Sequence, residues 1–158
     1  MKRTLLGIGV VALAIGGHAL TLYVPVIAGF FDLFLIVVVY YSLTTEQVNA
    51  MLVGAVCGLV QDALFSPILG VNAFAKALLG YLIGGLSTKG LLHRAPAQLT
   101  VLGVATLLQA LLLFVLQRVL GFSADLPGGG HLFVGTLGNV VLGGLLYAAL
   151  RRRQGRMR

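Results

Sequence analysis

The sequence predicts an all-α polytopic membrane protein, folded as one six-transmembrane-helix bundle. Two observations carry this prediction: apolar stretches fill almost the whole 158-residue chain, and 59% of its residues are hydrophobic while 9% are charged. Soluble proteins carry about 25% charged residues. Because a helix rises about 1.5 Å per residue, about 20 apolar residues cross a hydrocarbon layer about 30 Å thick.

The apolar stretches are continuous, which favours helices over the alternating strands of a membrane barrel. In lipid, each backbone N–H and C=O must find its partner within the protein, and a helix supplies that partner locally. We expect a single integral membrane domain over residues 1–158. Its expected spans are residues 4–23, 27–43, 47–65, 71–88, 97–119 and 132–150, followed by a basic tail at 151–158.

Each gap between these stretches contains residues that end helices or favour turns. Proline removes a backbone donor, and glycine and small polar residues favour tight turns. In chain order the breaks are Pro25, residues 44–47, Ser66 with Pro67, Pro96, and the loop 121–131 with its three consecutive glycines. The glycines of the last loop allow many backbone conformations, and the sequence assigns that loop no role.

Basic residues predict the orientation of the bundle. Six spans place one group on a single side: Lys2, Arg3, Lys89, Arg94, Arg151, Arg152, Arg153, Arg156 and Arg158. The opposite side receives Arg118 alone. Basic residues of short loops stay in the cytoplasm, so both termini are expected there. The net charge of +7 is concentrated at these helix ends, where membrane topology and contact with anionic lipid explain it. We therefore expect no nucleic-acid binding.

Three charged residues, Asp32, Asp62 and Lys76, lie inside the expected spans. A charge near the bilayer centre costs about 2.5–3.5 kcal/mol, so such residues are paired or functional. With Asn72 they lie at similar expected depth. In one interpretation Asp62 and Lys76, on either side of the hairpin apex at Leu69, form an ion pair that fixes the helix register. Asp32 then lies near the membrane interface in contact with water. In the other, the four residues line an outward-facing pocket for a polar ligand or a partner's side chain.

Small residues recur at four-residue spacing in three of the spans. Lipid gives helices no hydrophobic reason to associate, so close backbone approach through small residues supplies much of the packing. Most of these residues are expected to pack helices within the bundle, and the others to face a partner. The candidate helix-packing or partner-interface residues are Gly54, Gly58, Gly80, Gly84, Gly135, Asn139 and Gly143.

Signatures of catalysis and of cofactor or metal binding are missing from the sequence. The chain has no GxxxxGK[ST] phosphate loop, no HExxH zinc pair and no GxSxG nucleophile elbow. Its three histidines fall in separate regions, and Cys57 is the single cysteine. A thiolate metal cluster or a disulfide framework is therefore excluded. We expect no catalytic residue, no cofactor and no metal, and no enzymatic activity.

Four short segments together resemble a known family. They are Asp32-Leu33, Gly58-Leu59-Val60-Gln61-Asp62, Pro67 through Ala73, and Gly80-Tyr81-Leu82-Ile83-Gly84. In this order they resemble the bacterial rod-shape-determining membrane protein family MreD. The chain length, the six spans and the cytoplasmic termini also fit that family.

The resemblance implies a multi-pass protein of the bacterial inner membrane that is a non-catalytic scaffold of the cell-elongation machinery, which makes peptidoglycan. It implies an MreC-like single-span membrane protein as partner, in a wider assembly with the actin-like MreB, the glycan polymerase RodA and its transpeptidase. The helix number and glycine-rich style are also similar to the substrate-binding components of energy-coupling-factor transporters. The alternative is therefore a membrane subunit that captures a small molecule, with Lys76 in its pocket.

Overall fold

The structure, a computed structural model, describes residue 16 and residues 32–66, 68–87, 95–122 and 128–155. Every regular element in these residues is a helix, as the all-α prediction requires. The helices are α3 (Leu33–Ser42), α4 (Gln47–Phe65), α5 (Val71–Ser87), α6 (Ala95–Val119) and α7 (Gly129–Gly155). The expected first span and residues 27–31 of the expected second span lie outside the described residues, apart from Gly16.

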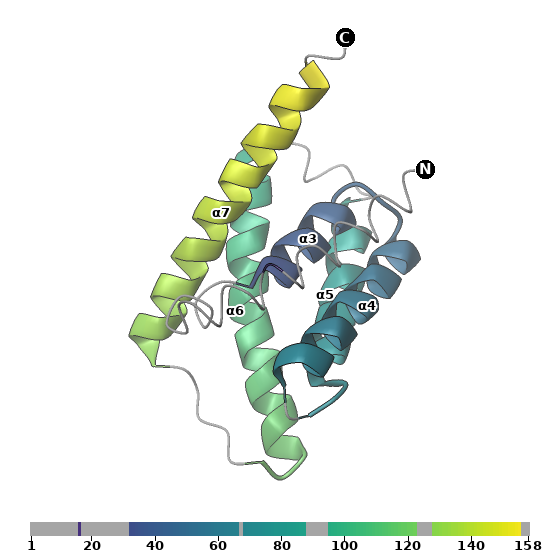
Figure 1. The fold of residues 1–158 in the computed structure, drawn as a ribbon, viewed down its shortest axis with the longest axis vertical. Helices are drawn as coiled ribbons and strands as arrows, with labels where there is room; N and C mark the ends of the chain where they lie inside the picture. The colour runs from purple at the N-terminus through teal and green to yellow at the C-terminus, as the bar shows by residue number, and fades with distance from the viewer. Residues whose placement is uncertain (1–15, 17–31, 67, 88–94, 123–127, 156–158) are drawn as a thin grey trace.

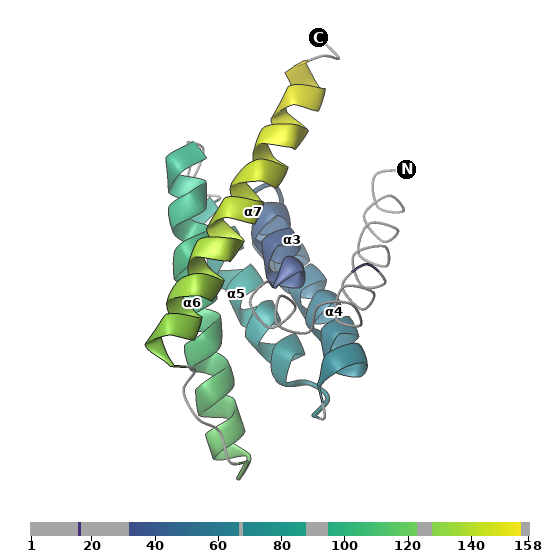
Figure 2. The ribbon, with the colours of Figure 1, turned by 60° about the vertical axis from the view of Figure 1, so that its left-hand side comes forward.

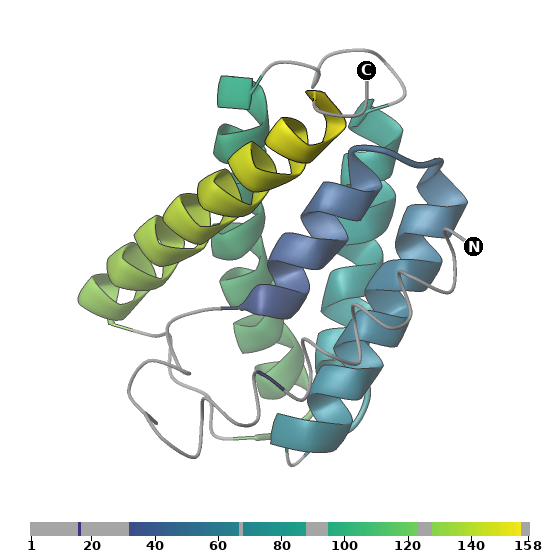
Figure 3. The same ribbon diagram turned by 45° about the horizontal axis from the view of Figure 1, so that its top comes forward.

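Helix α3 is the central element of the described fold. Figures 1 and 3 show it between the α4–α5 hairpin and the α6–α7 pair, and it contacts all four of these helices. In Figure 2, α3 overlaps α5, with α6 and α7 on one side of it and α4 on the other. Helix α3, with 10 residues, therefore packs against both helix pairs.

The apolar run of α3 is buried on two opposite faces. One face packs Leu35, Ile36 and Val39 into a core shared with α5 and α6. The other face packs Phe34 and Val38 against α4. A helix that is apolar all round is suited to this central position, whereas an amphipathic helix would leave polar groups in the core.

Helices α4 and α5 approach each other through glycine. A Cβ atom on Gly54 would overlap the carbonyl oxygen of Lys76, and one on Gly80 would overlap the carbonyl oxygen of Ala50. Backbone atoms cannot move aside as a flexible side chain can, so these positions need a residue without a side chain. The candidate packing residues in this contact are Gly54, Gly58, Gly80 and Gly84.

The α6–α7 pair packs mainly through side chains. Gly143 of α7 is buried, and a Cβ there would overlap the end of the Leu102 side chain rather than backbone. Gly135 is half-buried. The two helix pairs therefore differ in kind, with backbone contact holding α4 to α5 and side-chain packing holding α6 to α7.

Helix α3 begins later than the expected span. That span placed Asp32 inside a helix starting at residue 27, whereas in the structure Asp32 is the N-cap and the helix begins at Leu33. The reason is local, because the Asp32 carboxylate accepts a hydrogen bond from the Leu35 N–H, one of the donors left free in the first turn of a helix.

The other helix bounds follow the expected stretches closely, with extensions in α6 and α7. Helix α4 covers residues 47–65, and α5 ends one residue before the expected 88. Helix α6 begins at Ala95, since Pro96 is tolerated in a first turn. Helix α7 starts at Gly129 and continues to Gly155, so much of the expected tail is helical. Arginine is a good helix former, and no proline interrupts this part.

Two glycines with positive φ shape the connections. Gly70, at φ +100°, precedes α5. Gly121, at φ +79°, follows α6, where the Phe122 N–H donates to the Gln117 carbonyl at 2.9 Å and the Gly121 N–H to the Arg118 carbonyl at 3.1 Å. This pair of bonds is the Schellman motif, which satisfies the last carbonyls of a helix.

Length and apolar composition suffice for membrane crossing in two of the described helices. They are α4 and residues Ala97–Val119 of α6; α3, α5 and the segment Leu132–Leu145 are shorter apolar helices. Their outward faces are also apolar, with Leu52, Val104 and Val141 all more than half exposed. Such faces suit a hydrocarbon environment rather than water.

Candidate functional site

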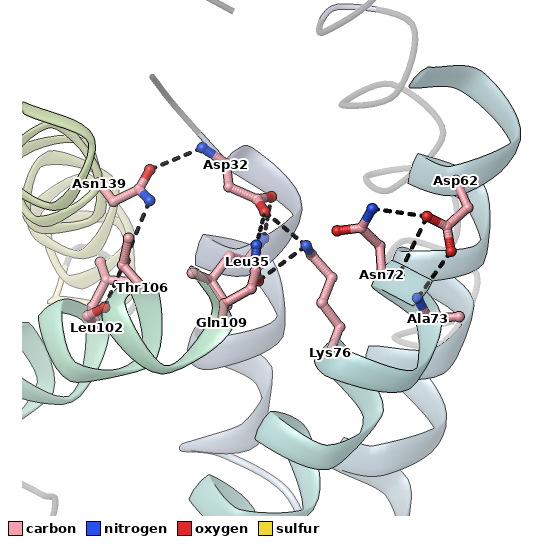
Figure 4. Close-up of polar contacts among 10 residues, drawn as sticks. All are labelled: Asp32, Leu35, Asp62, Asn72, Ala73, Lys76, Leu102, Thr106, Gln109 and Asn139. Atoms are coloured by element: carbon pink, nitrogen blue, oxygen red, sulfur yellow. Dashed lines mark hydrogen bonds and ion pairs between the residues drawn. The ribbon is translucent and has the colours of Figure 1, made fainter. Parts of the chain in front are cut away.

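Asp32 is the centre of a polar network at the start of α3. Its Oδ1 accepts the Leu35 N–H at 2.9 Å, which places a carboxylate at the positive end of the α3 dipole. Its Oδ2 points toward α5 and α6 (Figure 4). The residue therefore caps one helix and receives donors from two others.

Lys76 of α5 supplies the positive charge of this network. Its Nζ lies 2.7 Å from Asp32 Oδ2, and its side chain is 0% exposed while that of Asp32 is 14% exposed. A fully buried ammonium without a carboxylate beside it would be strongly unfavourable, so this pairing is what allows Lys76 to lie inside the bundle.

Gln109 of α6 binds both members of the ion pair. Its Nε2 donates to Asp32 Oδ2 at 2.6 Å, and its Oε1 accepts from Lys76 Nζ at 3.1 Å. An amide carries one donor group and one acceptor group, which match the carboxylate and the ammonium respectively. The three side chains therefore close a triangle between α3, α5 and α6.

Asn139 connects α7 to the same centre. Its Oδ1 accepts the Asp32 backbone N–H at 3.0 Å, and its Nδ2 donates to Thr106 Oγ1 at 3.3 Å. Thr106 in turn donates to the Leu102 carbonyl within α6 at 2.9 Å. Asn139 was a candidate helix-packing or partner-interface residue, and in the structure its buried side chain hydrogen-bonds α7 to the start of α3.

We call Asp32, Lys76, Thr106, Gln109 and Asn139 the four-helix network, since its members come from α3, α5, α6 and α7. Hydrogen bonding among buried polar groups removes most of the cost of keeping them away from water. The network gives the α4–α5 hairpin and the α6–α7 pair a common attachment point on α3. In the part of the chain that the structure describes, these polar groups bond to one another and to backbone atoms.

Asp62 forms a second, separate polar group at the start of α5. Its Oδ1 accepts from Asn72 Nδ2 at 2.8 Å and from the Asn72 N–H at 3.2 Å. Its Oδ2 accepts the N–H groups of Gly70 and Ala73 at 2.9 and 3.1 Å. A fully buried carboxylate thereby satisfies the orphan donors at the N-terminus of α5.

The interpretation that paired Asp62 with Lys76 is wrong, because the partner of Lys76 is Asp32. Both oxygens of Asp62 are engaged by donors at the start of α5. The structure divides the four candidate residues into two groups, Asp32 with Lys76 and Asp62 with Asn72 (Figure 4). Asp62 and Lys76 were expected to pair because they lie at similar depth in the α4–α5 hairpin, but depth alone did not determine the ion pair.

Two network members, Thr106 and Gln109, were not found from the sequence. They are uncharged, so they do not stand out inside a long apolar helix. The sequence did contain one signal: Thr106 and Gln109 are polar and three positions apart, so they lie on the same face of the helix. In the structure Gln109 is 7% exposed. Among the described residues, no three His, Cys, Asp or Glu side chains gather as metal ligands would.

Replacing Asp62 by alanine is expected to destabilise the protein by about 2 kcal/mol, because it removes a cap and leaves buried donors without an acceptor. Thermal unfolding in detergent micelles measures the loss. Glu46→Ala is the matched control, since Glu46 is the N-cap of α4 but makes no capping hydrogen bond through its side chain. Equal losses in the two variants would contradict the capping role of Asp62.

Comparison with known protein families identifies the chain. The model of rod shape-determining protein MreD matches residues 2–149, nearly the whole length. The chain belongs to the MreD family. Membership makes it a membrane protein with a role in rod-shape determination, as the resemblance implied. No curated protein and no solved structure matches the chain.

Proposed function

We propose that this MreD-family protein is a non-catalytic scaffold of the bacterial cell-elongation machinery that makes peptidoglycan. The observation that carries the proposal is the four-helix network. The charges of Asp32 and Lys76 are engaged with each other and with Gln109, so they bind helices together rather than remaining available to a substrate. A bundle fixed in this way presents a constant surface to other membrane proteins.

The proposed arrangement is a bundle of six spans in the inner membrane with both termini in the cytoplasm. Two features support it. The apolar outward faces of the described helices suit lipid, and the arginines at the end of α7 fall where the positive-inside rule retains basic residues. Helix α7 continues through these arginines, so a cytoplasmic helical extension would project from the bundle.

The proposed partner is an MreC-like single-span membrane protein, with MreB, RodA and its transpeptidase in the wider assembly. Membership in a rod-shape family supports this choice. A single transmembrane helix would pack on one of the exposed apolar helix faces, where van der Waals contact between helices replaces contact with lipid. Such binding needs no catalytic group in this chain.

Isolation of the tagged protein from its native membrane in mild detergent tests the proposal. We expect mass spectrometry to find an MreC-like single-span protein in near-equal amount. The matched control is Gly54→Leu, which should open the α4–α5 contact and lose that partner while unspecific contaminants remain. Recovery of an ATPase pair and a coupling subunit would contradict the scaffold and favour a substrate-binding transporter component.

A further inference from the structure

A partly open pocket lies between α3, α6 and α7, near the end of α3 opposite Asp32. Its cavity volume is about 40 Å³. About 10–15 Å³ of such volume holds one water-sized group, so the pocket has room for about three groups of that size. This room suits a short segment of a longer chain rather than a complete ligand.

The lining of this pocket is mainly apolar, and its polar residues are Tyr40 and Gln98. Ile36, Val39 and Leu43 follow one another at the three- and four-residue spacing of one face of α3, and Leu99 and Leu102 face them from α6. None of its lining residues is charged. Because the other six lining residues are apolar, most of the wall offers a polar guest no hydrogen bond and therefore favours a hydrocarbon guest.

Helix α7 runs from this mainly apolar pocket to three consecutive arginines of the sequence. Gly143 of α7 lines the pocket, and the helix continues from there to Gly155. Arg151, Arg152 and Arg153 lie on this continuation. Arg151 follows Gly143 by eight positions, a rise of about 12 Å along the helix axis. Along α7, the pocket is followed by basic residues, just as the acyl chain of an anionic lipid is followed by its charged headgroup.

We propose that the pocket holds part of an acyl chain of an anionic phospholipid, whose headgroup lies at the arginine-bearing end of α7. Charge complementarity selects the lipid class, because clustered basic residues at the membrane surface attract anionic headgroups. The bound lipid would fill the space between α3, α6 and α7, where packing depends on side chains. The proposal requires a membrane protein but does not depend on the scaffold role.

Tryptophan fluorescence offers a direct test, since the chain has no tryptophan. Tyr40→Trp places one indole at the pocket, and Tyr81→Trp places one on an exposed part of α5 as control. Each full-length variant is reconstituted in phosphatidylcholine vesicles containing brominated-chain phosphatidylglycerol or brominated-chain phosphatidylcholine at equal mole fraction. For Tyr40→Trp we expect quenching about twofold or more stronger with the anionic lipid. For Tyr81→Trp we expect equal quenching by the two lipids.

Removal of the arginine charges of α7 then tests whether they bind the lipid headgroup. Replacing Arg151, Arg152 and Arg153 together by glutamine should abolish the preference at Tyr40→Trp. Replacing Lys2, Arg3 and Arg118 together by glutamine, the same loss of charge elsewhere, should preserve it. Equal quenching of Tyr40→Trp by both lipids, no quenching, or a preference that survives loss of the α7 arginines would overturn the proposal.

A measurement on the unsubstituted protein keeps the proposal testable if a variant does not fold. Nanodiscs containing equal amounts of phosphatidylglycerol and phosphatidylcholine supply both lipids, and native mass spectrometry identifies what the released protein retains. We expect retained phosphatidylglycerol. Retention of phosphatidylcholine in equal amount, or of no lipid, would overturn the proposal.

Discussion

Lys76→Met is expected to destabilise the protein by about 3–5 kcal/mol, because it leaves the Asp32 carboxylate without its cation inside the bundle. Lys76 is fully buried and its Nζ lies 2.7 Å from Asp32 Oδ2. Methionine keeps the length and the apolar stem of lysine, so the substitution removes the charge with little change in packing. Equilibrium unfolding in mixed micelles measures the free-energy loss.

A double variant distinguishes loss of the ion pair from the cost of leaving one of its charges buried without a partner. Asp32→Asn combined with Lys76→Met removes both charges, and asparagine keeps an oxygen for the Leu35 N–H. We expect this double variant to be more stable than Lys76→Met alone, because no uncompensated charge remains. A double variant that loses the full sum of the two single losses would contradict the direct pairing.

Arg118→Met is the matched control for this series. Arg118 is exposed near the end of α6 and lies over the Phe114 ring at 5.5 Å from its centroid. An exposed cation of this kind contributes about 0.5–1 kcal/mol. A loss at Arg118 as large as that at Lys76 would show that removal of any positive charge, rather than of the buried one, causes the effect.

The sequence predicts the helices well where their ends have local chemical causes. The polar residues 44–46 lie between α3 and α4, and Ser66 and Gly70 lie between α4 and α5. These signals lie within a few residues of the boundary that they determine. The extension of α7 to Gly155 was missed because charge, which marks the end of a membrane span, does not end a helix.

The polar contacts were less predictable because they depend on how helices rotate against one another. Asp62 and Lys76 are the nearest opposite charges along the hairpin, yet Asp62 turns to the N–H groups of Gly70 and Ala73. Lys76 instead reaches Asp32, 44 residues away. Sequence identifies which residues need partners, and the packing of α3 against α5 decides which partners they meet.

Gly54→Ala is expected to destabilise the protein by about 3 kcal/mol, at the upper end of the usual cost of overpacking. Its new methyl group would overlap the Lys76 carbonyl oxygen, and a backbone atom within a helix cannot yield without moving the helix. Gly103→Ala is the matched control. A Cβ at Gly103 would lie 3.5 Å from the Val140 side chain, an ordinary contact. Alanine there should stabilise α6 by about 0.5–1 kcal/mol.

Combining two glycine substitutions tests whether α4 and α5 form one close contact. Gly80→Ala alone would overlap the Ala50 carbonyl oxygen in the same way. Once the helices separate to accept the first methyl group, the second meets less resistance. We therefore expect the double variant to lose less free energy than the sum of the two single losses, since neighbouring sites that share a backbone shift are not additive. Strictly additive losses in equilibrium unfolding would mean that each glycine is accommodated separately and that the helices do not move as rigid units.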